Sequence, residues 1–202
     1  MTVIEDAVAA INAGDLVVLP TDTVYGLACT PDGEAPVGAL SELKGRPPGQ
    51  PLALVAASVD RLLGAVPELH GRSERVARAL LPGPYTLVFP NPARRFARLT
   101  GERPETIGVR VPAVGGPGAV VLDLVGVVAA TSANVHGGPD PRRVEEVPVS
   151  ILAAASAVVD GGELPGTPST VVDLTADEPR VLREGAVTSD EALAAVGIAL
   201  AE

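Results

Sequence analysis

Short apolar segments that alternate with helical patterns are the feature that most constrains how this chain can fold. Residues 16–19 read Leu-Val-Val-Leu, a run typical of a strand buried on both faces of a sheet. Further strands are expected near residues 52–57, 86–89, 107–111, 127–130, 157–160, 170–174 and 180–183, and helices near residues 4–13, 36–44, 58–65, 72–81, 148–155 and 189–200. Residues 115–118 are expected to form a Gly/Pro loop.

Several of these strands are joined by connections too short for a helical crossover, which argues for a mixed sheet in an α/β fold. A length of 202 residues with 47% hydrophobic residues predicts one folded domain over residues 1–202 and excludes intrinsic disorder. No apolar run is long enough to cross a bilayer, and the first residues carry no signal pattern, so we expect a cytoplasmic protein without a membrane segment. The single cysteine excludes an internal disulfide and a thiolate metal cage.

The charge distribution indicates a local anion site. The net charge is −10 and aromatic residues make up only 2%, which argues against indiscriminate binding of nucleic-acid backbones and against a base-stacking platform. Residues 40–112, however, carry 11 Lys/Arg against 6 Asp/Glu, and the remaining residues carry 4 against 19. A basic middle in an acidic chain predicts a place where an anionic ligand binds.

Familiar nucleotide and hydrolase motifs are absent from the sequence. There is no GxxxxGK[ST] loop, no GxGxxG after a strand and no GxSxG elbow, and the two histidines lie far apart. A protein of this kind that handles phosphates must use side-chain cations and hydroxyls.

The first polar segment, residues 20–27 (PTDTVYGL), directly follows an apolar strand. Ligands commonly bind at the carboxyl ends of strands in open α/β sheets. The same residues could instead form an Asx or ST turn with Tyr25 packed in the core.

The second polar segment places Lys44 and Arg46 immediately before a proline-rich stretch. A compact point charge next to a bidentate guanidinium suits a polyphosphate. The alternative is a solvated helix end, where the helix dipole favours cations.

The third segment, residues 106–112 (TIGVRVP), holds Arg110 among apolar neighbours. A buried guanidinium needs a partner, either an aspartate in the protein or the carboxylate of a ligand.

The fourth segment, residues 130–134 (ATSAN), is followed by Gly137-Gly138, and Ser169-Thr170 and Arg183 mark two further strand ends. Together these segments predict a polar, cation-lined cavity.

The order of seven segments identifies a family. PTDTVYGL, KGRP…PL, PGPYTLVF, TIGVRVP, ATSAN, STVVDL and LREGA, spread over residues 4–187, resemble the YrdC-type threonylcarbamoyl-AMP synthases in their short, single-domain form. The resemblance implies a twisted open α/β sheet around a deep, positively lined cavity. It also implies a nucleotidyltransferase that makes threonylcarbamoyl-AMP and pyrophosphate from L-threonine, bicarbonate or CO2, and ATP, with Mg2+ bound to the nucleotide.

That reaction is the first step of the threonylcarbamoyladenosine modification of tRNA. The resemblance implies that the product passes to a separate tRNA threonylcarbamoyl-transferase complex, with at most a weak contact between this chain and tRNA itself.

The resemblance also implies the roles of individual residues. Lys44 and Arg46 would carry catalysis through charge stabilisation, without a covalent enzyme intermediate, and the sequence identifies no protein ligand for the Mg2+. The threonine contacts would be Thr23, Tyr25, Arg110 and Ser169; the ATP contacts would be Lys44, Arg46, Gln50, Thr106, Ser132, Asn134 and Arg183. Three positions depart from the family pattern: Gln50, Val55 where some relatives have a histidine, and Asp140 where some have a serine. An aspartate at position 140 would repel phosphate, so the nucleotide rim is expected to differ.

Two other functions remain open at this point. The basic segment could make the chain a double-stranded RNA or tRNA-binding module, although the net charge and the few aromatics weigh against it. The chain could also be a regulatory subunit that keeps the fold without catalysis, but the intact Lys44, Arg46, Ser132 and Asn134 argue against that.

Overall fold

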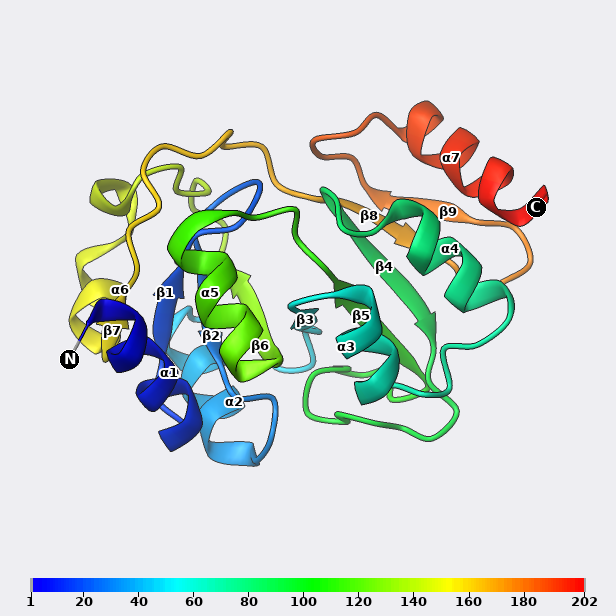
Figure 1. Ribbon diagram of the computed structural model, residues 1–202. Helices are drawn as coiled ribbons and strands as arrows, with labels where there is room; N and C mark the ends of the chain where they lie inside the picture. The colour runs from blue at the N-terminus through cyan, green and yellow to red at the C-terminus, as the bar shows by residue number, and fades with distance from the viewer. Residues whose placement is uncertain (1, 202) are drawn as a thin grey trace.

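The computed structural model describes residues 2–201 and is built around a nine-stranded sheet (Figure 1). The strands are β1 (Val17–Leu19), β2 (Gly26–Cys29), β3 (Ala53–Ala56), β4 (Tyr85–Pro90), β5 (Thr106–Arg110), β6 (Val127–Ser132), β7 (Ala157–Val158), β8 (Thr170–Asp173) and β9 (Arg180–Arg183). The helices are α1 (Val3–Ala13), α2 (Glu34–Leu43), α3 (Val59–Ala65), α4 (Arg72–Leu80), α5 (Gly116–Val125), α6 (Val149–Ala154) and α7 (Ser189–Ala201), with a 3-10 turn, η1, at Val144–Glu146.

The strand order is β7-β1-β2-β6-β3-β5-β4-β8-β9. The pairs β1/β7, β3/β5 and β4/β8 are parallel, and the other neighbours are antiparallel. The predicted α/β fold with a twisted, open and mixed sheet is therefore confirmed. No helix within residues 2–201 is both long and apolar enough to cross a membrane.

Two elements differ from the sequence prediction. The Gly/Pro loop expected at residues 115–118 is wrong, because Gly116 and Pro117 open helix α5. Proline is tolerated in a first helical turn, where its missing N–H would have no helical partner, and contacts with α1 support the helix. Residues 26–29, assigned only to a polar segment, form β2, which is held between β1 and β6.

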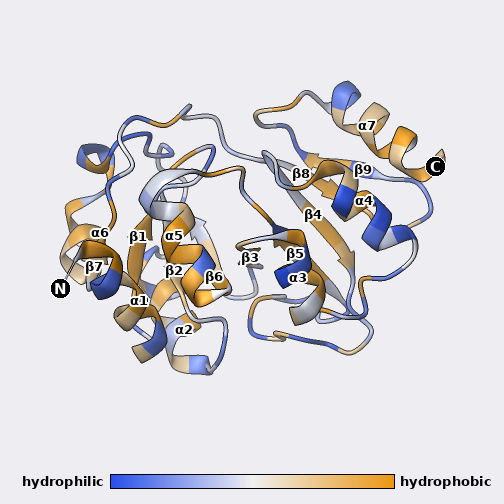
Figure 2. Cartoon of the chain, viewed as in Figure 1, coloured by the Kyte–Doolittle hydropathy of each residue, from blue (hydrophilic) through white to orange (hydrophobic). Residues whose placement is uncertain are grey.

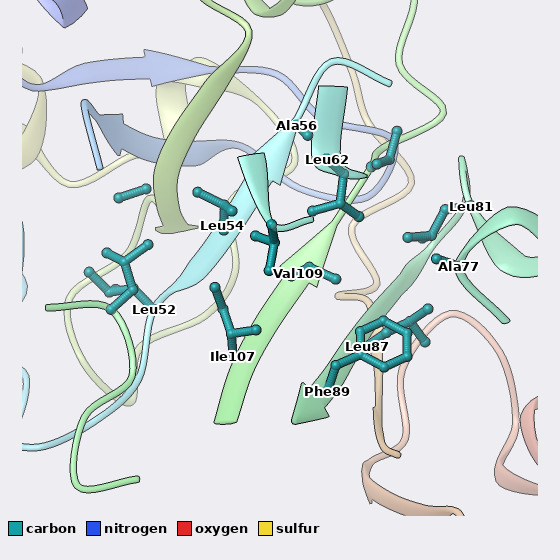
Figure 3. Packing of buried hydrophobic residues seen from close by; sticks show 14 of the residues in the cluster. Leu52, Leu54, Ala56, Leu62, Ala77, Leu81, Leu87, Phe89, Ile107 and Val109 are labelled. Atoms are coloured by element: carbon teal, nitrogen blue, oxygen red, sulfur yellow. The ribbon is translucent and has the colours of Figure 1, made fainter. Parts of the chain in front are cut away.

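Alternation along the strands sends apolar side chains to both faces of the sheet. On one face, residues such as Leu54 of β3, Leu87 of β4 and Val109 of β5 pack with Leu62 of α3 and Ala77 of α4 (Figure 3). The strands are hydrophobic along most of their length, while helices such as α1 and α4 carry both hydrophobic and hydrophilic residues (Figure 2). This face forms the larger hydrophobic core.

The opposite face is covered by helices over only part of its width. There Val17 and Leu19 of β1 and Val128 of β6 pack with Ile11 of α1 and Val121 of α5. Helices α1 and α5 contact β7, β1 and β6. On β3, β5, β4 and β8, most of the residues that alternate with the larger core line a cavity instead.

The loops at residues 45–51 and 91–105 meet backbone to backbone beside that cavity. Gly101 has a φ of 61°, and a Cβ built there would lie 2.0 Å from the carbonyl oxygen of Gly49. Glu102 N–H donates to the same carbonyl at 3.2 Å. Glycine is therefore required at position 101 by conformation and by space.

We predict that Gly101→Ala destabilises the protein more than Gly45→Ala, its matched control. Gly45 has a similar φ of 62°, but a Cβ there has no neighbour within 4 Å among the described residues. The control should cost about 1 kcal/mol for the left-handed backbone, and Gly101→Ala should cost about 1–3 kcal/mol more for overpacking. Urea unfolding of both variants measures this; equal losses of stability would contradict the close approach of the two loops.

Candidate active site

A cavity of about 490 Å³ occupies the part of the sheet face without helices. Its floor is made of small residues from paired strands: Ala53 of β3 lies opposite Ala130 of β6 and Gly108 of β5, and Gly26 of β2 lies opposite Ser132 of β6. Because these side chains are short or absent, the sheet surface itself forms the floor. The register thus explains why there is space for a ligand here.

Four arginines line the cavity: Arg46, Arg103, Arg110 and Arg183. Within residues 2–201, Glu102 is the one carboxylate in its lining. The predicted cation-lined cavity is therefore present in the structure. Over the same residues, no group of three or more His, Cys, Asp or Glu side chains is arranged to hold a metal ion.

Arg110 lies at the end of β5 and is only 9% exposed. Its Nη2 donates to Asp22 Oδ1, to Thr23 Oγ1 at 2.7 Å and to Thr21 Oγ1 at 3.4 Å. Its Nε is buried and has no hydrogen-bond partner in the described part of the chain. The sequence allowed an aspartate or a ligand as partner, and the structure contains the aspartate.

Lys44 ends α2 and is 3% exposed, so its interpretation as a solvated helix end is wrong. Its Nζ donates to the carbonyls of Ser132 and Asn134 and to Asn134 Oδ1, the last at 2.6 Å. Asn134 Oδ1 also accepts from Ser132 Oγ at 2.7 Å. The ammonium group therefore holds the turn after β6 in place and presents Ser132 to the cavity.

Burial and, to a smaller extent, the nearby charge of Arg46 lower the pKa of Lys44 to about 8, against the opposing effect of Asp140. Burial also lowers the pKa of Arg46, whose Nη1 donates to Thr131 Oγ1 at 3.1 Å and whose Nη2 donates to the Pro51 carbonyl at 2.8 Å. Its Nε is buried without a partner among residues 2–201. Cations that are desolvated and crowded in this way favour binding of an anion.

Arg183, the last residue of β9, is another of the arginines that line the cavity. Its Nη2 donates to the Ser169 carbonyl at 2.8 Å and to Ser169 Oγ at 3.3 Å. Ser169 Oγ in turn lies 2.8 Å from Thr86 Oγ1. Partial burial lowers the pKa of Arg183, and Arg110 contributes to that lowering.

The structure sorts the predicted site residues into three groups. Six line the cavity: Arg46, Thr106, Arg110, Ser132, Ser169 and Arg183. Lys44, Thr23 and Asn134 are buried behind this lining and bond to it. Tyr25 and Gln50 lie outside the lining.

Tyr25 is fully buried, as the alternative interpretation of its segment predicted. Its hydroxyl lies within hydrogen-bond distance of Asp160 Oδ1 and the Gly162 carbonyl, at 2.9 and 2.7 Å, and accepts from Gly161 N–H. Burial raises the pKa of Tyr25 to about 12, so the phenol stays neutral. Gln50 is exposed, although its neighbours Gly49 and Pro51 line the cavity.

Several lining residues have no assigned role in the sequence prediction. Thr86 lies inside the PGPYTLVF segment and Thr131 inside ATSAN, so membership in these segments was the available signal. Thr100, Glu102 and Arg103 come from the loop at residues 91–105, whose sequence carries no motif. Of the departures from the family pattern, Val55 lines the cavity, and Asp140 Oδ1 accepts from Asn134 Nδ2 at 3.3 Å.

Comparison with known proteins identifies the family. The Sua5/YciO/YrdC family model, described as "Telomere recombination", matches residues 9–185. A threonylcarbamoyl-AMP synthase of Pyrococcus abyssi is 35% identical over 196 residues, which is 95% of this chain and 56% of that protein. One from Vibrio vulnificus is 32% identical over 186 residues, which is 90% of this chain and 98% of that protein.

A solved structure agrees with these matches. The crystal structure of P. abyssi Sua5 complexed with L-threonine superposes with a TM-score of 0.83 at 34% identity, covering 96% of this chain and 57% of that one. The chain thus spans little more than half of the Pyrococcus protein and nearly all of the Vibrio protein.

We predict that Lys44 makes folding stability depend on alkaline pH. Its pKa is about 8 in the folded chain against 10.5 ordinarily, so the unfolded state holds more protons between these values and stability rises with pH across that window. Below pH 8 the cost of burying the charge is present in full. Relative to Lys44→Met, the free energy of unfolding of the unmodified protein should rise by about 3 kcal/mol from pH 8 to 10.5. Urea titrations of both proteins measure this, and a constant difference would contradict the lowered pKa.

Proposed function

The chain belongs to the Sua5/YciO/YrdC family, and on that premise we propose that it is itself a threonylcarbamoyl-AMP synthase. It joins L-threonine, bicarbonate or CO2, and ATP into threonylcarbamoyl-AMP and releases pyrophosphate. One observation carries the proposal: Arg46, Arg110, Ser132, Ser169 and Arg183, from five separate segments, line a single cavity. The names of the curated relatives support this enzyme and favour neither the RNA-binding nor the regulatory alternative.

L-Threonine binds at the Arg110 end of the cavity. The guanidinium of Arg110 donates to the amino-acid carboxylate through Nη1, which makes no hydrogen bond within residues 2–201, and such charge-assisted hydrogen bonds are strong. The hydroxyls of Thr86 and Ser169 and the apolar Val55 and Val171 line the same cavity. This combination of polar and short apolar groups suits a small hydroxylated side chain.

ATP binds along Arg46, Thr106, Ser132 and Arg183, which combine two cations with two hydroxyl groups. Lys44 contributes in two ways: its charge lies behind Ser132, and its hydrogen bonds hold the turn from Ser132 to Asn134. The donor set within residues 2–201 does not fit an ion held by the protein alone. Mg2+ bound to the nucleotide would supply neutralisation of the phosphate charge.

The chemistry needs positioning and charge stabilisation more than proton transfer by the enzyme. Bicarbonate supplies CO2 by taking up a proton and losing water. The neutral threonine amine attacks CO2, a C–N bond forms, and the proton that the amine loses in giving the carbamate balances the proton taken up by bicarbonate. A carbamate oxygen then attacks the α-phosphorus, and the bond to the leaving pyrophosphate breaks with its electron pair. Arg46 and the charge of Lys44 stabilise the negative charge that develops on the phosphates.

The product is a reactive mixed anhydride, so a partner must consume it. We assign that role to a tRNA threonylcarbamoyl-transferase complex in the cytoplasm, where tRNA and ATP are both present. A direct contact of this chain with tRNA is not needed for the reaction.

The experiment that tests this function follows labelled bicarbonate. We expect a labelled adenylate when the protein is incubated with ATP, Mg2+, labelled bicarbonate and L-threonine, with one pyrophosphate released per adenylate. Other amino acids should give markedly less.

Lys44→Ala and Arg46→Ala should each lower the rate of adenylate formation by about 100-fold or more. Arg98→Ala should retain that rate, because Arg98 is exposed and pairs with Glu34 at 2.9 Å outside the cavity. Full activity of Lys44→Ala in a folded protein would remove Lys44 from the site, and no adenylate with any amino acid would refute the function.

Arg110→Ala should separate the two substrates. Losing a hydrogen bond to a charged group costs about 1.5–3 kcal/mol, so the KM for L-threonine should rise by about 10- to 100-fold, while the KM for ATP changes little. Steady-state pyrophosphate release at varied concentrations of each substrate measures the split. Equal increases in both KM values would show that Arg110 does not bind the amino acid.

A further inference from the structure

We propose that Asp22 is a positioning residue for L-threonine, because its carboxylate orients the Arg110 guanidinium toward the amino-acid end of the cavity. The inference rests on the proposed function and adds to it a residue that does not itself need to touch either substrate. Asp22 belongs to the segment between β1 and β2, whereas Arg110 ends β5. The two residues are 88 positions apart in the chain.

The Asp22 carboxylate is bonded at both oxygens. Oδ1 accepts from Arg110 Nη2, and Oδ2 accepts from the backbone N–H of Ala113 at 2.9 Å. The side chains of Arg110 and Asp22 are 11% and 9% exposed. One carboxylate thus ties the arginine side chain to the backbone just beyond β5, which restricts both the side chain and the segment that carries it.

The hydrogen bonds that Arg110 makes to Asp22 and its neighbours, which we call the clamp, decide which nitrogen of the guanidinium is available to a ligand. Nη2 is engaged by Asp22, Thr23 and Thr21, whereas the buried Nε has no partner in the described residues. A guanidinium presents its five N–H groups in one plane. With Nη2 held from the side of residues 21–23 and Nε enclosed by the protein, Nη1, which makes no hydrogen bond within residues 2–201, is the nitrogen left for a carboxylate in the cavity.

Charge alone would not explain an aspartate at this position. A carboxylate beside Arg110 reduces the attraction of that arginine for a second carboxylate. Within residues 2–201, Arg46 and Arg183 form no salt bridge although both line the same cavity, whereas Arg103 pairs with the exposed Glu105 at 3.4 Å and with Asp173 at 3.7 Å. Asp22 therefore weakens the attraction of Arg110 for a ligand carboxylate but fixes the orientation of its guanidinium.

Two substitutions separate geometry from charge. Asp22→Asn keeps an oxygen for Ala113 N–H but turns a donor toward Arg110, so the clamp on the guanidinium is lost. Asp22→Glu keeps the charge, but its longer stem cannot place the carboxylate on Arg110 Nη2 and Ala113 N–H in the same way. Each variant should raise the dissociation constant for L-threonine by about 10-fold, with the ATP dissociation constant changed by less than about 3-fold.

The test is a double-mutant cycle read by calorimetric titration of L-threonine and, separately, of ATP. Asp22→Asn, Arg110→Ala and the double variant are compared with the unmodified protein, and circular dichroism and thermal unfolding check that each is folded. If Asp22 acts through Arg110, Asp22→Asn should add no further loss of L-threonine affinity once Arg110 is alanine. Asp60→Asn, which breaks an exposed pair with Arg78 (2.9 Å), is the control for net charge and should bind both ligands normally.

The outcomes are distinct. Loss of L-threonine affinity that disappears in the Arg110→Ala background supports positioning. Tighter binding of L-threonine by Asp22→Asn, unchanged binding, or an equal loss in both backgrounds would overturn it. If Asp22→Asn does not fold, the charge-retaining Asp22→Glu decides between the same results. An unmodified protein that binds no L-threonine at all would instead overturn the proposed function.

Discussion

A guanidinium buried at the end of the central strand β5 is the constraint on which the arrangement of the site depends. A buried charge is costly unless it is paired and hydrogen-bonded, and Arg110 obtains its partners from Thr21, Asp22 and Thr23, far away in the sequence. The segment between β1 and β2 must therefore reach across the sheet to the end of β5. That one requirement brings the first polar segment of the chain and the TIGVRVP segment together.

The second condition is a sheet that is covered unequally on its two faces. The larger core runs along one face with α3 and α4, whereas α1 and α5 cover only part of the other. Where that cover ends, Ala53, Gly108 and Ala130 form a floor too small to fill the space. The continuous core on the first face supports the sheet beneath the cavity. A ligand site can thus exist in the middle of the sheet without loss of the fold.

Much of this could be predicted from the sequence, because local signals and tertiary structure agree for most elements. Apolar runs marked eight of the nine strands, and the buried arginine required a partner of opposite charge or a ligand. The predictions that were wrong are those in which long-range contacts overrule local sequence. Residues 116–118 are helical because α5 packs on α1, and β2 forms because strands on both sides supply its hydrogen bonds. Lys44 is buried because Asn134 and Ser132 surround its ammonium group.

By itself, the sequence determined the class of fold, the family and the segments that carry polar and cationic groups, because these follow from patterns within a few residues of each other. Only the tertiary structure decided which of those groups face the cavity. Tyr25 and Arg110 both belong to singled-out motifs, yet one is directed into the core toward Asp160 and the other lines the site. The direction of a side chain at the end of a strand depends on partners that lie far away in the chain. No local sequence pattern encodes the positions of those partners in the folded protein.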